Sequence, residues 1–190
     1  MMYFIRIEWY GMFIISIPVY AFLTIPLLIA LSGGEPQGTV FSIGAIDFGL
    51  FLFVYCLGHI GYLLIYSTWM AAMLILIVMV CDASAFMVRL RLKSTFSKAL
   101  GTYFLSLSFT VLLSRLLSPW TGIPPGHALV LGALIPLLVV MGRHTIDVIK
   151  EDLGITDEKL LPGRGQILDC MKSIFYTAPV VFHYIRYFLT

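Results

Sequence analysis

The stretch WMAAMLILIVMVCDASAFMV, residues 69–88, decides the fold, because its one charged side chain, Asp82, lies in an otherwise apolar run. An α-helix needs about 20 mainly apolar residues to cross the hydrocarbon core of a bilayer. Such runs recur along the chain, and we expect about six membrane-spanning helices, over residues 11–32, 48–66, 69–88, 100–117, 128–141 and 174–189. The last run is short and contains Pro179, His183 and Arg186, so the pattern is compatible with five or six spans.

The composition excludes a water-soluble globular protein. Hydrophobic residues make up 60% of the chain and charged residues only 12%, whereas a soluble domain carries about 25% charged residues. The 12 Lys and Arg are offset by 10 Asp and Glu, so the chain lacks the dense basic surface of a nucleic-acid-binding protein, and we expect no nucleic-acid partner. The sequence therefore predicts an all-α integral membrane protein, with residues 1–190 forming a single polytopic domain in the lipid bilayer.

Basic side chains concentrate in two segments. Nine of the 12 lie there, namely Arg89, Arg91, Lys93 and Lys98 after the third expected helix, and Arg143, Lys150, Lys159, Arg164 and Lys172 after the fifth. Segments that are separated by two membrane helices lie on the same side, and an excess of Lys and Arg marks that side as cytoplasmic. We therefore expect the loops 89–99 and 142–173 to face the cytoplasm from the cytoplasmic (inner) membrane, with the N-terminus outside.

The polar segment after the fifth expected helix begins with a second helical pattern. Within residues 142–154, the apolar residues Ile146, Ile149 and Leu153 recur at helical spacing, and Gly154 suits a C-terminal stop. We therefore expect an amphipathic cytoplasmic helix that continues the fifth membrane helix, followed by a loop before the last helix. Charged residues in such a helix are also typical of a solvated face, so this pattern alone does not define a site.

Two further features are candidates for a functional site. The PGRG sequence, residues 162–165, forms a compact backbone whose N–H groups can approach an anion, with Arg164 projecting from it. A simple turn back into the membrane explains the same residues. Asp82 lies within or at the edge of a membrane helix, where an unpaired carboxylate costs about 3 kcal/mol. A buried ion pair is one explanation of Asp82, and a role in a site is the other.

The C-terminal stretches resemble the signature of the phosphatidate cytidylyltransferase (CDP-diacylglycerol synthase) family of integral membrane enzymes. That signature runs roughly as GDxxESxxKRxxGIKD, then LPGHGGxLDRxDS, then an apolar helix that carries a proline. The corresponding stretches here are GRHTIDVIKEDLGITD at 142–157, LLPGRGQILDCMKS at 160–173, and Pro179. The spacing of the two motifs matches almost without gaps.

A weaker resemblance lies upstream. The family has an Asp-x-x-Ala-Tyr/Phe element followed by a basic stretch and a Lys-Thr-x-x-Gly motif. This chain has DASAF at residues 82–86, then Lys98 and Gly101. The resemblance covers residues 81–182, and the preceding residues are similar to the family only in being hydrophobic.

The resemblance implies transfer of CMP from CTP to phosphatidate, or to a related anionic lipid, with release of pyrophosphate in phospholipid biosynthesis. Reactions of this kind use Mg²⁺ held by carboxylates. By resemblance, Asp169 and Asp82 are metal ligands whose carboxylates must converge, and they act with Lys150 as catalytic residues. Substrate binding is implied for Lys98, Arg143, Pro162, Gly163, Arg164, Gly165, Lys172 and Ser173. The resemblance also implies a homodimer.

The sequence departs from the signature where the metal would bind. Arg143 and Lys172 replace acidic residues, and Arg164 replaces a histidine; a cation cannot ligate Mg²⁺ and repels it at short range. In one outcome, Asp169 and Asp82 hold one Mg²⁺ while the three cations bind phosphates. In the other, the chain is a catalytically impaired relative that binds an anionic lipid or partners a membrane protein. A third alternative, an unrelated transporter or assembly subunit, would spread ionisable residues through several helices.

Overall fold

The computed structural model describes residues 9–33, 37–92, 94–152 and 164–189, and every regular element in these ranges is a helix. The side chains of residues 164–170 are outside the described part of the chain. The chain divides into two compact units, residues 1–62 and 63–190. The expected all-α membrane fold is confirmed.

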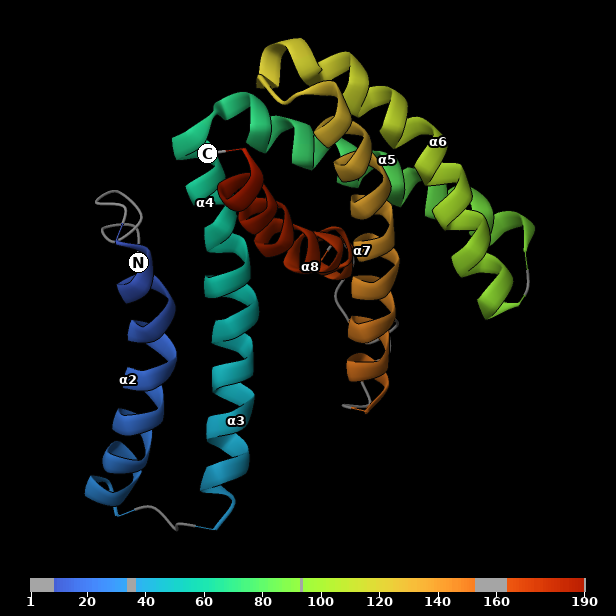
Figure 1. Cartoon of the computed structure of the whole chain (residues 1–190). Coiled ribbons are helices and arrows are strands. Elements are labelled where there is room, and N and C mark those ends of the chain that lie inside the picture. Colours follow the sequence, from blue (N-terminus) through green and yellow to red (C-terminus); the bar gives the residue numbers. More distant parts are fainter. Residues whose placement is uncertain (1–8, 34–36, 93, 153–163, 190) are drawn as a thin grey trace. The chain divides into compact units, whose positions relative to one another are not determined.

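The first unit is built around a pair of apolar helices that lie side by side (Figure 1). Its elements are α2 (Tyr10–Leu31), α3 (Thr39–Leu50), the π-helix η1 (Phe51–Cys56) and the first part of α4 (Leu57–Tyr66). Gly38 precedes α3 with a φ of 84°, a left-handed conformation that glycine adopts without steric cost. Most large side chains of α2 and α3 are apolar and exposed, as expected for helices that lipid chains surround.

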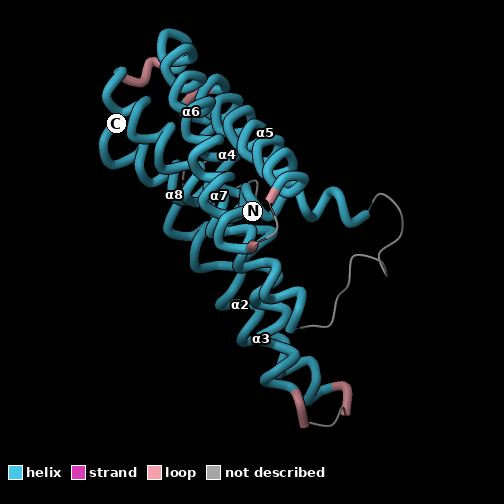
Figure 2. Tube along the Cα trace, turned by 90° about the vertical axis from the view of Figure 1, so that its right-hand side faces the viewer, coloured by secondary structure: helices cyan, strands magenta, loops and turns pink. Residues whose placement is uncertain are grey.

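The second unit packs four long helices against one another. They are α5 (Thr68–Arg91), α6 (Thr95–Thr121), α7 (Pro125–Asp152) and α8 (Arg164–Phe188). The hydroxyl of Ser67 caps α5 by accepting a hydrogen bond from the backbone N–H of Trp69 at 3.2 Å. Gly122, with a φ of 71°, ends α6. Helix α6 packs against α5 and α7, and α8 packs against α7 and α5 (Figures 1 and 2).

Small residues allow α6 and α7 to approach closely. A Cβ atom on Gly132 would lie 2.8 Å from the Cα atom of Val111, so only glycine fits there. The hydroxyl of Thr110 donates a hydrogen bond to the carbonyl oxygen of Gly132 at 2.6 Å. Thr110 belongs to a buried polar stripe along α6, formed by Thr102, Ser106, Thr110 and Ser114. Close approach through small residues is how membrane helices gain packing contacts that the hydrophobic effect does not supply inside lipid.

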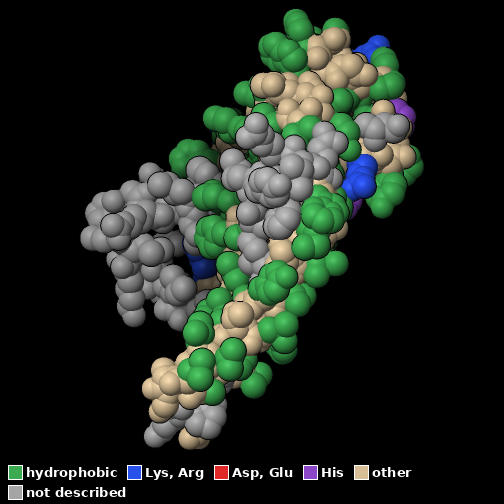
Figure 3. Space-filling model, turned by 90° about the vertical axis from the view of Figure 1, so that its left-hand side faces the viewer, with side chains coloured by type: hydrophobic (Ala, Val, Ile, Leu, Met, Phe, Trp, Pro, Cys, Tyr) green, Lys and Arg blue, Asp and Glu red, His purple; other side chains and the backbone are tan. Residues whose placement is uncertain are grey.

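Five helical segments in the described ranges are long and apolar enough to cross a membrane. They are Tyr10–Leu31, Val40–Tyr66, Thr68–Arg91, Phe96–Thr121 and Pro125–Asp152. Hydrophobic side chains are spread over much of the described surface that Figure 3 presents. This surface agrees with a bilayer as the surrounding solvent.

The helix bounds refine the sequence-based expectation at three places. The second span begins at Val40 rather than at residue 48, and it therefore includes Asp47. Helix α7 runs unbroken to Asp152, which confirms that the fifth membrane helix continues into the amphipathic stretch. Helix α8 begins at Arg164 rather than at residue 174 and is not among the five apolar spans. Polar residues in its first turns conceal this helix from a prediction based on hydropathy.

Candidate functional site

A cavity of about 400 Å³ lies where the C-terminal half of α5, the start of α6 and the C-terminal half of α7 meet. We call it the site cavity. Its ionisable lining residues are Arg89 from α5, Lys98 from α6, and Arg143, His144, Asp147 and Glu151 from α7. The two basic segments of the sequence therefore meet at one end of the second unit. The short connection between α5 and α6 brings Arg89 and Lys98 together, and α7 returns to the same end.

The charges of the site cavity are divided between its helices. All three helices contribute a cation, whereas both carboxylates, Asp147 and Glu151, come from α7. Positions 143, 147 and 151 are four residues apart, so they lie along one face of the helix. Arginine and lysine side chains bind phosphate through charge-assisted hydrogen bonds. The cavity therefore presents cations that can bind phosphate from all three helices, and carboxylates from α7.

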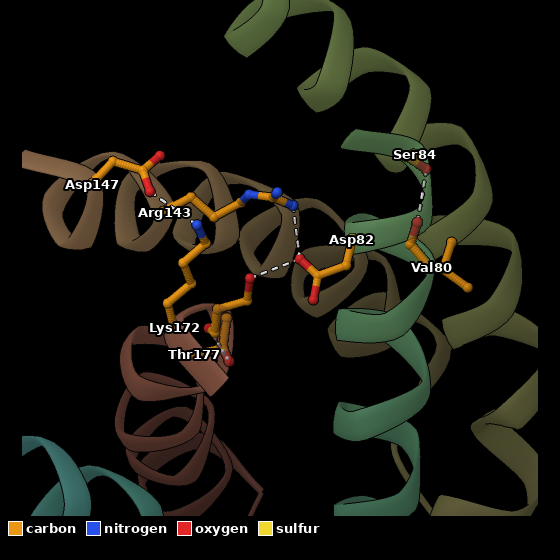
Figure 4. Close-up of polar contacts among 8 residues, drawn as sticks. Val80, Asp82, Ser84, Arg143, Asp147, Lys172 and Thr177 are labelled. Carbon is orange, nitrogen blue, oxygen red and sulfur yellow. Dashed lines mark hydrogen bonds and ion pairs between the residues drawn. The ribbon is translucent and has the colours of Figure 1, made fainter. Parts of the chain in front are cut away.

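Asp82 on α5 accepts hydrogen bonds from side chains of two other helices (Figure 4). Its Oδ1 atom accepts a hydrogen bond from Nη1 of Arg143 at 2.9 Å and another from the hydroxyl of Ser173 at 2.8 Å. The side chain of Arg143 is 14% exposed and that of Asp82 is 24% exposed. The sequence left two explanations open for Asp82, and one of them, an ion pair, is present in the structure. The ion pair links α5 to α7, and the hydrogen bond from Ser173 links α5 to α8.

A second ion pair links α8 to α7. Nζ of Lys172 donates to Oδ1 of Asp147 at 2.9 Å, and the side-chain exposures are 3% and 45%. A buried ammonium group needs a nearby anion, because desolvation otherwise disfavours its charge. Figure 4 shows Arg143 and Asp147 on α7 with Lys172 reaching up from α8. Two substitutions that replace family acids, Arg143 and Lys172, thus each have a carboxylate partner.

The structure brings part of the predicted site together. Lys98 and Arg143 line the site cavity, and Asp82, Lys172 and Ser173 form the ion-pair network beside it. Lys150, predicted as catalytic, is buried in α7 and is not among the lining residues of the described cavity.

The side chains of the other predicted residues are not described by the structure. Pro162 and Gly163 lie outside the described residues. Arg164, Gly165 and Asp169 belong to the first turns of α8, but their side chains are not described. The convergence of Asp82 with Asp169, and the anion-binding PGRG turn, therefore stay predictions.

Four ionisable lining residues were missed by the sequence interpretation. These are Arg89, His144, Asp147 and Glu151. The signal that could have found them is the spacing of four residues from Arg143 through Asp147 to Glu151, which places three ionisable groups on one face of a helix. Arg89 follows the third expected span directly, and the basic segments were expected on one side of the membrane.

The described acidic side chains alone do not fit a closed Mg²⁺ site. Among the residues that the structure describes, no three His, Cys, Asp or Glu side chains gather closely enough to hold a metal ion. Oδ1 of Asp82 already accepts from Arg143 and Ser173, and Oδ1 of Asp147 accepts from Lys172. A protein site for Mg²⁺ commonly uses one or two carboxylates completed by substrate phosphates and water. The described carboxylates therefore provide only part of the ligands that a Mg²⁺ site needs.

Two curated relatives share sequence with the chain. The uncharacterized protein YnbB of Escherichia coli (strain K12) is 28% identical over 197 residues, which cover 94% of this chain and 65% of that protein. A phosphatidate cytidylyltransferase of Synechocystis sp. is 39% identical over 56 residues, which cover 29% of this chain and 19% of that protein. The chain thus spans less than two thirds of the length of either relative. No solved structure matches the chain.

Similarity at the level of the family extends over nearly the whole chain. The sequence profile of the cytidylyltransferase family matches residues 1–188, which include the first unit as well as the region 81–182. The resemblance to phosphatidate cytidylyltransferases is confirmed by this match and by the shorter match to the Synechocystis enzyme. With its five apolar spans the chain is an integral membrane protein, and it belongs to the cytidylyltransferase family.

Proposed function

We propose that this protein is a membrane-embedded CDP-diacylglycerol synthase-like enzyme that transfers CMP from CTP to phosphatidate and releases pyrophosphate, in phospholipid biosynthesis. The observation that carries the proposal is the site cavity, in which three helices of a cytidylyltransferase-family chain each present a cation. CTP is a soluble polyanion and phosphatidate is a lipid phosphate. A cationic cavity at the ends of apolar helices suits both substrates.

The chemistry asks the protein to position two anions and to balance charge. A phosphate oxygen of phosphatidate attacks the α-phosphorus of CTP, and the bond to pyrophosphate breaks. Arg89 and Lys98 at the cavity wall supply fixed positive charge toward the phosphates, and Arg143 adds a planar fork that matches phosphate oxygens. Mg²⁺, which we propose as the cofactor with Asp169 and Asp82 as its predicted ligands, would supply further charge neutralisation when bound.

We place the cavity on the cytoplasmic side of the inner membrane in this proposal, because CTP is a cytoplasmic nucleotide and Arg89, Lys98 and Arg143, which belong to the two basic segments, line the cavity. This orientation is tested by a single cysteine in a chain whose three natural cysteines, Cys56, Cys81 and Cys170, are replaced by alanine. Ser94 is exposed between α5 and α6, so Ser94→Cys should react with a membrane-impermeant maleimide in inside-out vesicles and not in intact spheroplasts. Labelling from outside would contradict the orientation. The proposed homodimer is tested by the mass of the detergent-solubilised protein in light scattering.

The alternative function is that of a catalytically impaired relative that binds an anionic lipid or partners a membrane protein. One observation favours it. Asp82 and Asp147 both hold a cation at 2.9 Å, and in that arrangement these carboxylates neutralise side chains of the protein itself.

One assay separates the two functions. The purified full chain in detergent is given phosphatidate, labelled CTP and Mg²⁺, and CDP-diacylglycerol and pyrophosphate are measured. The enzyme forms both products, and Lys98→Gln lowers kcat/KM by about 10-fold or more, the loss expected for a charge-assisted hydrogen bond. Arg115→Gln is the matched control, because Arg115 is exposed on α6 and does not line the described cavity. Absence of product together with phosphatidate binding that Lys98→Gln weakens would establish the alternative instead.

A further inference from the structure

Asp82 and Arg143 form one ion pair, yet only one member of the pair reaches the site cavity. Arg143 is among the residues that line the cavity, and Asp82 is not among the described lining residues. We propose that Asp82 is a positioning residue, which holds the guanidinium of Arg143 at the cavity wall so that Arg143 binds a phosphate group of the substrate. This inference rests on the proposed transfer of CMP and replaces one part of that proposal, the ligation of Mg²⁺ by Asp82.

Asp82 is well placed to fix the position of Arg143. Its Oδ1 atom accepts from Nη1 of Arg143 on α7 at 2.9 Å and from the hydroxyl of Ser173 on α8 at 2.8 Å. Two donors from two helices fix the direction of the carboxylate, and the carboxylate in turn fixes the guanidinium. Arg143 has five N–H donors, and in the described part of the chain its hydrogen bond to Asp82 is the one that the structure shows. The rest of the fork is available to phosphate oxygens.

The surroundings explain why Arg143 needs this anchor. Its long side chain loses considerable conformational entropy when it is held in one rotamer, and a second helix that supplies a carboxylate fixes the rotamer before the ligand arrives. An unpaired carboxylate is disfavoured in the apolar span Thr68–Arg91, so Asp82 is in turn stabilised by the guanidinium of Arg143. Asp147 and Lys172 are the corresponding pair one turn along α7, but there the carboxylate lines the cavity and the buried cation stands behind it. The two pairs thus present opposite charges to the ligand.

The test is a double-mutant cycle on ligand binding, with Asp82→Asn, Arg143→Gln and the double variant. Asparagine keeps the shape of the aspartate side chain and one acceptor oxygen, so Asp82→Asn is expected to fold. Affinity for CTP is measured by equilibrium dialysis on the detergent-solubilised full chain, once with Mg²⁺ and once with excess chelator. We expect Arg143→Gln to weaken binding by about 10-fold to 100-fold and Asp82→Asn by about 10-fold. The double variant should bind no more weakly than Arg143→Gln, because Asp82 acts only through Arg143.

The metal condition distinguishes positioning from metal ligation. If Asp82 positions Arg143, the loss caused by Asp82→Asn is the same with and without Mg²⁺, and Arg143→Lys retains part of the affinity. A loss that occurs only with Mg²⁺, or losses that multiply in the double variant, would overturn the proposal. Thermal unfolding of each variant, with Ser173→Ala beside it, reports folding separately from binding. Unchanged CTP affinity in both single variants would also overturn it.

Failure of the proposed function is recognised separately. If the wild-type chain binds no CTP, the nucleotide part of that function is wrong, and the same cycle is run with phosphatidate in mixed micelles against phosphatidylcholine. Non-additive losses of phosphatidate binding would then support the positioning role by itself. Binding of neither phosphate compound would overturn both proposals.

Discussion

Both units contain helices that are long and apolar enough to cross a membrane, but they differ in how far those helices are buried within the protein. In the most apolar windows of Tyr10–Leu31 and Val40–Tyr66, 6% and 11% of the residues are buried within the protein, against 50% and 44% in Thr68–Arg91 and Pro125–Asp152. The corresponding share in Phe96–Thr121 of the second unit is 22%, so all three apolar spans that begin in the second unit are buried to a greater extent than those that begin in the first. Among the described residues, the ion pairs and the site cavity lie in the second unit.

The charged residues show the same contrast. Asp47 is the one charged side chain in the described residues of the first unit, and its Oδ1 atom is buried without a hydrogen-bond partner in the described structure. It borders an apolar cavity with Val19, Phe22 and Leu23. In the second unit, Asp82 and Asp147 each accept from a cation. Packing of several helices supplies partners for buried charge, and a helix pair in lipid does not.

The largest loss of stability is expected when a large side chain is introduced at the contact between α6 and α7. Gly132→Leu forces the two backbones apart, since even a Cβ atom there would meet the Cα atom of Val111 at 2.8 Å. We expect a loss of about 3 kcal/mol or more, measured as a lower thermal unfolding midpoint in detergent. Gly44→Leu in α3 is the matched control, because nothing lies within 4 Å of its Cβ position. Equal losses at the two glycines would contradict the difference in packing.

A smaller loss is expected when the buried ammonium of Lys172 loses the carboxylate of Asp147. Asp147→Asn removes the full negative charge that lies 2.9 Å from the ammonium of this side chain, which is 3% exposed. Because Asp147 itself is 45% exposed, solvent screening reduces the effect to about 2 kcal/mol. Denaturant unfolding of Asp147→Asn beside Asp152→Asn, an exposed position on the same helix, measures it. A loss at Asp152 as large as that at Asp147 would argue against a specific ion pair.

The polar stripe of α6 allows a milder test. Thr110→Val keeps the shape of the side chain and removes the hydrogen bond to the carbonyl oxygen of Gly132, which is 2.6 Å long. We expect a loss of about 1 kcal/mol. Ser108→Ala, at an exposed position whose hydroxyl bonds within its own helix, should be close to neutral in the same unfolding assay. A neutral Thr110→Val would show that the stripe contributes only close packing.

The smallest effect is expected in the first unit and has the opposite sign. Asp47→Leu replaces an unpartnered buried carboxylate atom by an apolar group, so we expect an unchanged or slightly raised unfolding midpoint, with a gain of up to about 1 kcal/mol. Asp82→Leu should lower the midpoint, because it strands the guanidinium of Arg143. Destabilisation by Asp47→Leu would mean that this carboxylate has a partner in the membrane, and the contrast between the units would then be smaller.

The sequence predicted the class of fold and the end of the molecule at which the site lies, and it predicted single residues less well. Lys98 and Arg143 were expected to bind substrate, and both line the site cavity. Asp147 and Glu151 were not expected there, because charges on a helix that leaves the membrane look the same whether they face water or a cavity. The start of α8 was placed too late, since its first turns carry polar residues that hydropathy does not separate from a loop.

The features that can be predicted from the sequence are local. They are runs of apolar residues long enough to span lipid, basic residues gathered in two segments, and motif spacing that marks the cytidylyltransferase family. Each of these follows from residues near one another along the chain. Only the tertiary structure decided that Arg143 pairs with Asp82, 61 positions away, and Lys172 with Asp147, 25 positions away. Such partners depend on which faces three helices turn toward one another. Packing sets those faces, and it gives the cations at family acidic positions carboxylates to neutralise them.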